Sequence, residues 1–397
     1  MLDFQKLITQ ITNVGLDTVS SDIGDTSQAL INAQTAFEEA VAGSAAFISR
    51  LEQNEFLPYW PVSLPLEPVR ADYEVPEFET PYTVVAADGS QIMPSHHEVF
   101  NCYLLNMGTT MISYGVKLPP ILNSMPRLYH RPEDLYPLVD RRRVHIDELY
   151  VTLERNLLEL TTVYELAATA SDRKIPVIAF VDGSLIPWSL EKMPDNYQMA
   201  YMTACGEVLQ SLQSMRIPLV GYISHSRSSD LINGLRVSKC PYPLSQCRDY
   251  CGHLNEEDFP CSSIWPCTDR QLLSGNMAPR RRTCTLLSGA SLARALPSKH
   301  QICFTYANVG AEIARLEFPR WVAEDAEMLN LAVAVSMSQA RKGAGYPVSL
   351  SEAHNLAIIR GSDRAKFFEL LARHLVSLGM DRVRPSPKES RKRRGIV

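Results

Sequence analysis

The sequence lacks long apolar runs and has no excess of basic residues. No stretch of its 397 residues approaches the roughly 20 consecutive apolar residues that a membrane-spanning helix needs, which excludes integral membrane proteins of the helical class. The first ten residues, MLDFQKLITQ, lack the basic and then apolar pattern of a secretory signal, so a cytoplasmic protein without a membrane partner is expected. The net charge of −5 does not by itself predict a nucleic-acid-binding protein.

The nine cysteines are an odd number, and no secretory signal accompanies them, so they predict thiols or metal ligands rather than a disulfide framework. Their spacing within residues 238–282, CX6CX3CX9CX5C, contains one CX2–4C unit, Cys247/Cys251, whereas standard zinc fingers pair two such units. Two interpretations are open: a zinc or iron–sulfur site in an inserted loop, or a group of reduced, partly buried thiols. The residues concerned are Cys240, Cys247, Cys251, Cys261 and Cys267.

Composition changes along the chain predict its domain organisation. Apolar residues at three- and four-residue steps predict an N-terminal helical segment over residues 1–57. Prolines crowd residues 58–80, which predicts a connector. One domain is expected over residues 81–382, with a Cys-rich insertion at 238–282, and the basic tail at 383–397 is expected to be disordered.

An Asp-Gly-Ser tripeptide occurs twice, each time after an apolar run. Asp182 follows the run IPVIAFV, which is typical of a strand buried on both faces, and Asp88 follows Thr83-Val-Val-Ala-Ala. Two such strands can bring both carboxylates to one edge of a sheet. The alternative is simple turn chemistry, in which Asp accepts backbone N–H bonds and Gly supplies a positive φ.

Alternating helix and strand patterns predict an α/β fold with a mixed sheet flanked by helices. The strongest pattern is an amphipathic helix over residues 144–170, in which Glu154 and Glu165 border the apolar stripe on one side and Glu159 borders it on the other. Residues 117–140 are punctuated by proline and are expected to be a loop. Further helices are expected at 197–215, 324–341 and 364–378, and further strands at 98–113, 217–223, 301–309 and 311–318.

The stretch GYPVSLSEAH contains Tyr346 and His354. Ser349 and Glu352 fit a capping box that predicts a helix beginning at Leu350. His354 then shares a face with apolar residues, as a satisfied core histidine would. Carboxylates with an imidazole also suit divalent ions, which neutralise a phosphate and help to deprotonate water. A metal-dependent hydrolase is therefore one hypothesis.

Five phrases standing in one order resemble the NurA family of DNA-end-processing nucleases over most of residues 80–382. They are AADGS at 86–90, FVDGSL at 180–185, GYISHSR at 221–227, VGAEIARLEFPRW at 309–321 and GYPVSLSEAH at 345–354. The resemblance implies a ribonuclease-H-like core acting on DNA with Mn²⁺, or with Mg²⁺ in its place. It also implies a homodimer that works with a hexameric HerA-type ATPase.

The resemblance assigns roles to individual residues. It implies that Asp88, Asp182 and a helix glutamate, matched to Glu165, are metal ligands. His354 is then a ligand or proton-transfer group, and Tyr346 positions the substrate. If the helix packs antiparallel to the strand before Asp182, helix and strand rises favour Glu154 instead, so Glu154 is the substitute.

Phosphate contacts are expected from Arg227, although a surface salt bridge explains this arginine equally well. The clusters Arg141–Arg143 and Arg280–Arg282 can hold phosphates or can be ordinary solvated surface.

The leading hypothesis is a Mn²⁺-dependent deoxyribonuclease that resects DNA double-strand breaks for repair, as a 5′–3′ exonuclease, a single-strand endonuclease or both. One alternative is a non-catalytic DNA-binding adaptor of the same fold for the ATPase motor. Another is a metal-dependent phosphohydrolase of small nucleotides.

Overall fold

The structure is a computed structural model that describes residues 2–12, 16–78, 81–95, 98, 100–139 and 141–380. The chain divides into two compact units. Unit 1 comprises Met1–Val75, Ser224–Arg294 and Cys303–Arg315, and unit 2 comprises Pro76–Ile223, Ala295–Ile302 and Leu316–Val397. The units therefore divide the chain at places other than the boundaries expected from composition.

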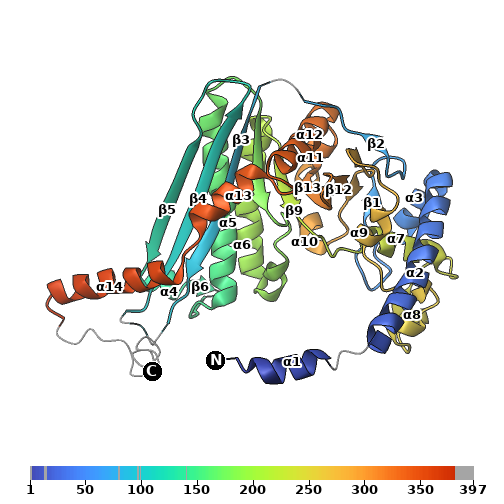
Figure 1. Ribbon diagram of the computed structural model, residues 1–397, viewed down its shortest axis with the longest axis horizontal. Coiled ribbons are helices and arrows are strands. Elements are labelled where there is room, and N and C mark those ends of the chain that lie inside the picture. The colour runs from blue at the N-terminus through green and yellow to red at the C-terminus, as the bar shows by residue number, and fades with distance from the viewer. Residues whose placement is uncertain are drawn as a thin grey trace. The chain divides into compact units, whose positions relative to one another are not determined.

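Unit 2 is built on a mixed sheet in which five strands follow the order β9-β8-β3-β4-β5 (Figure 1). Strands β3, β4 and β5 form an antiparallel meander, whereas β8 and β9 run parallel to β3. All residues of β8 before its terminal aspartate are buried, as expected for a strand covered on both faces. The expected mixed sheet flanked by helices is therefore present.

Helices α5 and α13 cover opposite faces of this sheet. A side chain at Gly89 of β3 would meet α5, whereas a side chain at Gly108, the partner of Asp88 in the β3–β4 ladder, would meet α13. Successive residues of a strand point to opposite faces. Residue 89 therefore faces α5, and residue 88 faces α13. Helix α6 packs against α5, and α12 packs against α13.

The expectation of a loop over residues 117–140 is wrong. Residues Ile121–Tyr129 form β5, which follows β4 at the end of the sheet, and most of its side chains are exposed. With little burial on either face, the strand has no apolar alternation to reveal it. Pro126 is tolerated because an edge strand need not donate every backbone N–H to a neighbour.

The C-terminal helices lie close to their expected positions, with one correction. Helix α13 begins at Val348 rather than Leu350, and its N-cap is Pro347, which has no side-chain cap. Ser349 is buried inside the first turn, where its N–H donates to Gln339. The expected capping box therefore does not form.

The elements of unit 2 in chain order are β3 (Tyr82–Ile92), β4 (Tyr103–Tyr114), β5 (Ile121–Tyr129), α4 (Pro132–Leu135), β6 (Leu138–Val139), β7 (Arg142–Arg143), α5 (Glu148–Ser171), β8 (Val177–Asp182), η1 (Trp188–Lys192), α6 (Asp195–Ser214), β9 (Leu219–Ile223), η4 (Ser298–His300), the second half of β13 (Ile313–Pro319), α11 (Arg320–Ala323), α12 (Ala326–Lys342), α13 (Val348–Ala357) and α14 (Gly361–Ser377). Within the described ranges, none of the helices has the length and apolar character that crossing a bilayer requires. The basic tail at 383–397 lies outside the described residues.

Unit 1 joins the N-terminal helices to residues from the middle of the chain. Helix α2 packs against α7, α9 and η3, and α3 packs against α7. The expected connector at 58–80 contributes two short strands, β1 and β2, which pair with β11 and β10. The segment at 238–282 contains only short elements after the end of α7.

The elements of unit 1 in chain order are α1 (Phe4–Thr12), α2 (Leu16–Ala42), α3 (Ser44–Gln53), β1 (Leu64–Pro65), β2 (Tyr73–Glu74), α7 (Asp230–Lys239), α8 (Cys247–Tyr250), η2 (Glu256–Asp258), η3 (Ser262–Ile264), α9 (Asp269–Ser274), β10 (Arg281–Arg282), β11 (Leu286–Leu287), α10 (Ser291–Ala295), most of β12 (Ile302–Asn308) and the first half of β13.

A buried carboxylate organises the polar interior of unit 1. Asp269 is fully buried and accepts hydrogen bonds from the backbone N–H groups of Leu231 and Ile232, both at 3.0 Å, in the first turn of α7. The Tyr306 hydroxyl donates to the same carboxylate at 2.6 Å. The start of α7 is therefore capped by a residue distant in sequence, which ties the helix to the segment after the cysteines.

We expect Asp269→Ala to lower the free energy of unfolding by about 3 kcal/mol or more, because two helix N–H groups and a phenol would lose their buried acceptor. Urea denaturation followed by circular dichroism measures this loss. Asp258→Ala, in the exposed part of the same insertion, is the control and should change stability by less than about 0.5 kcal/mol. Equal midpoints for the two variants would contradict the assigned role.

Candidate functional site

The register of two parallel strands places Asp88 beside Asp182. Strands β3 and β8 pair with Ala87 opposite Val181, so the next residue on each strand is an aspartate. Neighbouring strands lie about 4.8 Å apart, and residues in register point to the same face. The two carboxylates therefore leave the sheet side by side, as the repeated tripeptide predicts.

The two glycines after these aspartates serve different physical purposes. Gly183 has a φ of +90°, so it turns the chain at the end of β8, as the turn interpretation expects. Gly89 instead lies within β3, where a side chain would overlap Met107, Glu159 and Arg155. The first tripeptide is thus not a turn: its glycine lets α5 approach the strand closely.

Helix α13 brings an imidazole to the first aspartate. His354 Nδ1 lies 2.7 Å from Asp88 Oδ2, and 57% of the His354 side chain is exposed. The histidine is therefore not a core residue, although Leu350 and Ala357 of the same helix are buried. The Tyr346 hydroxyl, just before α13, is hydrogen-bonded to Asp182.

The third carboxylate of the site is Glu159, which requires a correction. Glu165 is exposed and does not line the pocket that contains the two aspartates. Glu154 is half-buried and accepts a hydrogen bond from the Tyr197 hydroxyl at 3.0 Å. Glu159 is buried, lines the pocket and interacts with the charges of Asp88 and Asp182.

Burial and like charges raise the pKa values of these acids. Burial raises the pKa of Glu159 to about 8; the Arg155 guanidinium lowers it, while Asp88 and Asp182 raise it further. The pKa of Asp182 is also raised, mainly by the protein atoms packed around it and in part by Asp88, against the lowering effect of the Tyr346 hydroxyl. Three acidic groups thus share a site in which only part of their charge is neutralised.

The donors of this site suit a hard divalent cation. Three carboxylates and an imidazole are the ligands that Mn²⁺ and Mg²⁺ accept. Glu159 Oε1 is buried and makes no hydrogen bond, although Arg155 Nε lies 3.1 Å away. His354 is held by Asp88 and Tyr346 by Asp182, and among the described residues no three His, Cys, Asp or Glu side chains already surround one point. The residues therefore fit the cation by the chemistry of their donor atoms and not by an arrangement that is already formed around one point.

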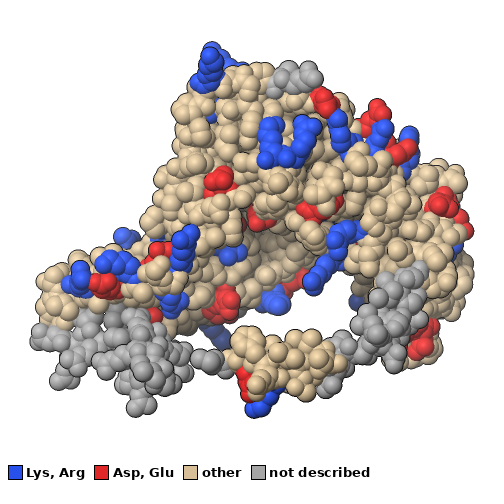
Figure 2. Space-filling view, in the orientation of Figure 1, with Lys and Arg blue, Asp and Glu red and all other residues tan. Residues whose placement is uncertain are grey.

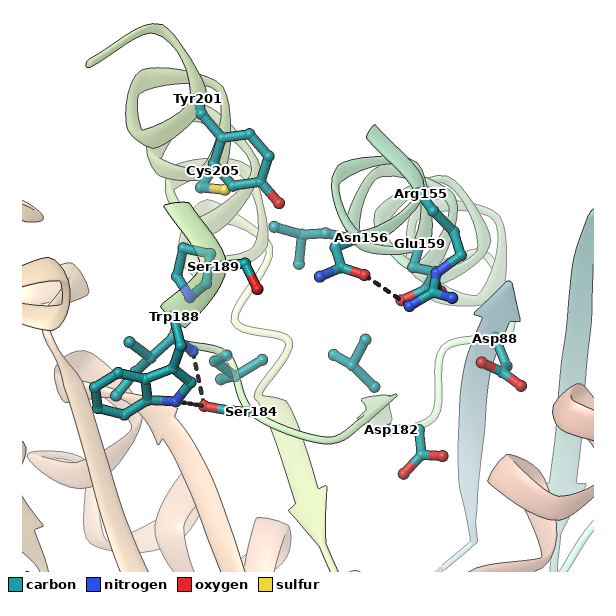
Figure 3. A pocket seen from close by; sticks show the side chains of 15 residues that line it. Asp88, Arg155, Asn156, Glu159, Asp182, Ser184, Trp188, Ser189, Tyr201 and Cys205 are labelled. Carbon is teal, nitrogen blue, oxygen red and sulfur yellow. Dashed lines mark hydrogen bonds and ion pairs between the residues drawn. The ribbon is translucent and has the colours of Figure 1, made fainter. Parts of the chain in front are cut away.

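The two aspartates and Glu159 line a pocket of about 360 Å³ (Figure 3). Helix α5 contributes Arg155 and Asn156 to its wall, and the loop after β8 contributes Ser184 and Trp188. Figure 3 shows Trp188 and Asp88 at opposite sides of the pocket, with Asp182 between them. The loop is fixed by buried Glu317, which accepts hydrogen bonds from Ser184 Oγ at 2.8 Å and from the Leu185 N–H at 2.9 Å.

The basic residues singled out in the sequence differ in their surroundings. Arg227 is exposed and belongs to unit 1, whereas the carboxylates belong to unit 2. Arg281 and Arg282 form ion pairs with Glu74 and Glu67, both at 2.7 Å, which makes the second arginine cluster at least partly structural. On the face shown in Figure 2, basic and acidic side chains are interspersed, as they are along α14.

The five cysteines of the insertion do not form one group. Cys240, Cys247, Cys251 and Cys261 lie near enough to influence one another's thiols, whereas Cys267 packs in a separate apolar cluster with Ile264 and Leu272. Burial raises the pKa of the Cys247, Cys251 and Cys267 thiols. This arrangement gives no support to a zinc or iron–sulfur site built from all five.

Sequence reasoning missed three contributors to the site. The sequence places Glu159 at one border of the apolar stripe of α5. Which border faces the site depends on how α5 crosses the sheet. Gly108 has no motif around it; it matters because it faces the backbone of α13. Trp188 has no motif around it that marks it as part of a site.

Comparison with known proteins gives one family. The family model described as NurA domain matches residues 82–359. Among solved structures, the NurA nuclease from Sulfolobus solfataricus is 10% identical with a TM-score of 0.47, and the alignment covers 87% of this chain and 95% of that chain. A NurA structure with manganese is 11% identical with a TM-score of 0.38, covering 79% and 93%. No curated protein matches the chain.

The contact between Gly108 and α13 predicts that a small substitution will displace His354. A methyl group at Gly108 would overlap backbone atoms of Ala353 and Ala357, on either side of the histidine. We expect Gly108→Ala to lower the free energy of unfolding by about 1–3 kcal/mol, because backbone cannot yield as a flexible side chain can. Thermal unfolding measures the change.

Gly206→Ala is the matched control for this prediction. Gly206 lies within α6 and has open space where the methyl group would go. Since alanine favours a helix by up to about 1 kcal/mol over glycine, this variant should melt at the same temperature or higher. A Gly108→Ala protein as stable as Gly206→Ala would show that α13 is not held against β4 in this way.

Proposed function

The chain belongs to the NurA domain family, and we propose that it is a divalent-metal-dependent nuclease that hydrolyses phosphodiester bonds at DNA ends. The observation that carries this proposal is the convergence of Asp88, Glu159 and Asp182 at one pocket, with His354 on Asp88. Packing three carboxylates together costs free energy unless a cation or proton offsets their repulsion. A purely structural role gives no reason for such a group at the mouth of a pocket.

Asp88, Asp182, Glu159 and His354 would hold Mn²⁺, or Mg²⁺ in its place. Bound there, the cation would neutralise the scissile phosphate and lower the pKa of an attacking water. Asp88 lies against Nδ1 of His354, an arrangement that leaves Nε2 of the exposed ring as the nitrogen that would face the cation. The Tyr346 hydroxyl fixes the orientation of Asp182.

The strand order of unit 2 supports the ribonuclease-H-like core that the resemblance implies. We further propose DNA double-strand-break end resection as the process, with 5′–3′ exonuclease activity, single-strand endonuclease activity or both. A HerA-type ATPase as partner and a homodimer as the working assembly complete the proposal. The process, the type of nuclease activity, the ATPase partner and the homodimer all rest on the sequence resemblance.

Two glutamates of one helix test the site. We expect Glu159→Gln to reduce Mn²⁺-dependent shortening of labelled linear DNA by about 100-fold or more, because a carboxylate that would hold the cation is lost. Glu165→Gln, on the exposed side of α5, should cut at the normal rate. Both substitutions conserve size and replace one carboxyl group of α5 by an amide, so the pair isolates the effect of position.

Other outcomes of this assay are equally informative. If Glu165→Gln fails and Glu159→Gln cuts, the sequence-based match was correct and the site assigned from the structure is wrong. If the wild-type chain shortens neither duplex nor single-stranded DNA with Mn²⁺ or Mg²⁺, with or without the ATPase, a non-catalytic DNA-binding adaptor is the better description.

Asp88→Ala and Asp182→Ala should each abolish cleavage while the chain stays folded.

The raised pKa of Glu159 predicts a pH-dependent stability in the absence of metal. Its pKa rises from 4.5 to about 8 on folding, so between these values the folded chain binds a proton that the unfolded chain has lost. Stability from this group therefore falls as the pH rises through that range. In chelator, the free energy of unfolding of the wild type relative to Glu159→Gln should decrease from pH 5 to pH 8.

Mn²⁺ should reverse this loss, because metal binding requires the deprotonated carboxylate. The rise in melting temperature on adding Mn²⁺ should be larger at pH 8.5 than at pH 6.5 in the wild type and in Glu165→Gln. A pH-independent difference between the wild type and Glu159→Gln would contradict the buried, protonated state of this glutamate.

A further inference from the structure

We propose that the pocket beside Asp88 and Asp182 holds the terminal nucleotide of a single DNA strand, with its base stacked on the indole of Trp188. The inference rests on the proposed nuclease function and specifies the form in which the substrate enters. It requires an accessible aromatic face, a fixed ring orientation, and a pocket of the right size next to the acids. The structure supplies each of these.

The indole of Trp188 is accessible and yet fixed. Its residue is 48% exposed, while Nε1 donates to Ser184 Oγ at 3.3 Å. Ser184 in turn donates to Glu317, which is only 1% exposed. The polar edge of the ring is thus satisfied by a chain of hydrogen bonds that ends in the interior, and the flat apolar face is left for a ligand. A ring held in advance loses less entropy when it binds.

The same short loop sets the positions of the ring and of a carboxylate. Ser184 completes the Asp-Gly-Ser tripeptide that begins with Asp182, and the Ile186 N–H also donates to Ser184 Oγ at 3.1 Å. The serine therefore has a purpose that the turn interpretation does not explain: it couples the aromatic platform to the acidic site. A nucleotide stacked on Trp188 would occupy the pocket that Asp88 and Asp182 also line.

The size and walls of the pocket favour one nucleotide over a duplex. Its volume of about 360 Å³ lies at the small end of the range for small-molecule sites. Asn156 and Ser189 present polar groups to the cavity, and Leu160 and Ile186 contribute apolar surface (Figure 3). Stacking on an aromatic ring tolerates every base, which suits an enzyme that must process any sequence.

The experiment measures binding without cleavage. Fluorescently labelled (dT)12 is titrated with the full-length chain in EDTA, and anisotropy gives the dissociation constant. We expect Trp188→Ala to weaken binding about tenfold and Trp188→Phe to recover most of the loss, since phenylalanine retains a stacking surface. Phe56→Ala, which removes an aromatic ring 76% exposed that does not line this pocket, should bind like the wild type.

An abasic nucleotide at the end of the oligonucleotide tests the stacking partner directly. Removing the terminal base should weaken binding to the wild type but not to Trp188→Ala, because the contact is already absent. An abasic position at the centre should give no such difference between the two proteins. Equal binding by the wild type and Trp188→Ala, or equal sensitivity of both to the terminal base, would overturn the proposal.

These outcomes are separable from the fate of the nuclease proposal. A chain that fails to cut DNA with any metal yet shows the coupling between Trp188 and the terminal base keeps the nucleotide site and loses the catalytic assignment. A chain that cuts DNA normally without that coupling keeps the nuclease function and loses the nucleotide site. Melting temperatures of the Trp188 variants, measured alongside, establish that they are folded.

Discussion

The pairing of β3 with β8 is the constraint on which the candidate site depends. Because Ala87 lies opposite Val181, Asp88 and Asp182 are neighbours by register rather than by loop geometry. A one-residue slip would turn one of the two carboxylates to the opposite face of the sheet. The buried apolar residues of both strands make such a slip costly, since it would also turn the core residues outward. Stability of the core therefore fixes the position of the acids.

Two helices approach the sheet closely and so position the other two side chains of the site, and glycine residues in the strands permit this approach. Gly89 lets α5 bring Glu159 against one face of β3, and Gly108 lets α13 bring His354 against the other. Side chains of β4 hold α13 in place: Asn106 Nδ2 donates to the Ala357 carbonyl at 2.9 Å, and Thr110 Oγ1 donates to the Ser349 carbonyl at 3.1 Å. The site is thus built from two helices on opposite faces, which meet where β8 ends.

The carboxylates of the candidate site have one basic or hydroxyl partner each. Arg155 is the cation beside Glu159, and it also donates to Gln91 and Asn156. Unit 1 shows the contrast. There Asp269 is buried just as deeply, but backbone N–H groups and a phenol satisfy its oxygens, so it needs no further partner. The two buried acids therefore differ in their partners: Asp269 is held by two backbone N–H groups and a phenol, whereas Glu159 lies beside Arg155 and two other carboxylates.

The sequence by itself determined the buried strand before Asp182, the amphipathic helix of α5, the two aspartates and the Tyr346–His354 stretch. These follow from local periodicity and short motifs, which are read without knowing what packs against what. It did not reveal β5, because a strand with both faces exposed leaves no alternation of apolar residues. It led to Glu165, with Glu154 as the substitute, rather than to Glu159, because all three glutamates border one helical stripe.

Only the tertiary structure made that choice, because the crossing of α5 over β3 decides which border of the stripe meets the acids. The same holds for Gly108 and Trp188, whose importance lies in what they face across space. Local patterns record which residues are apolar and where chain direction changes. The distance between side chains far apart in the sequence depends on packing, and packing depends on the whole domain at once.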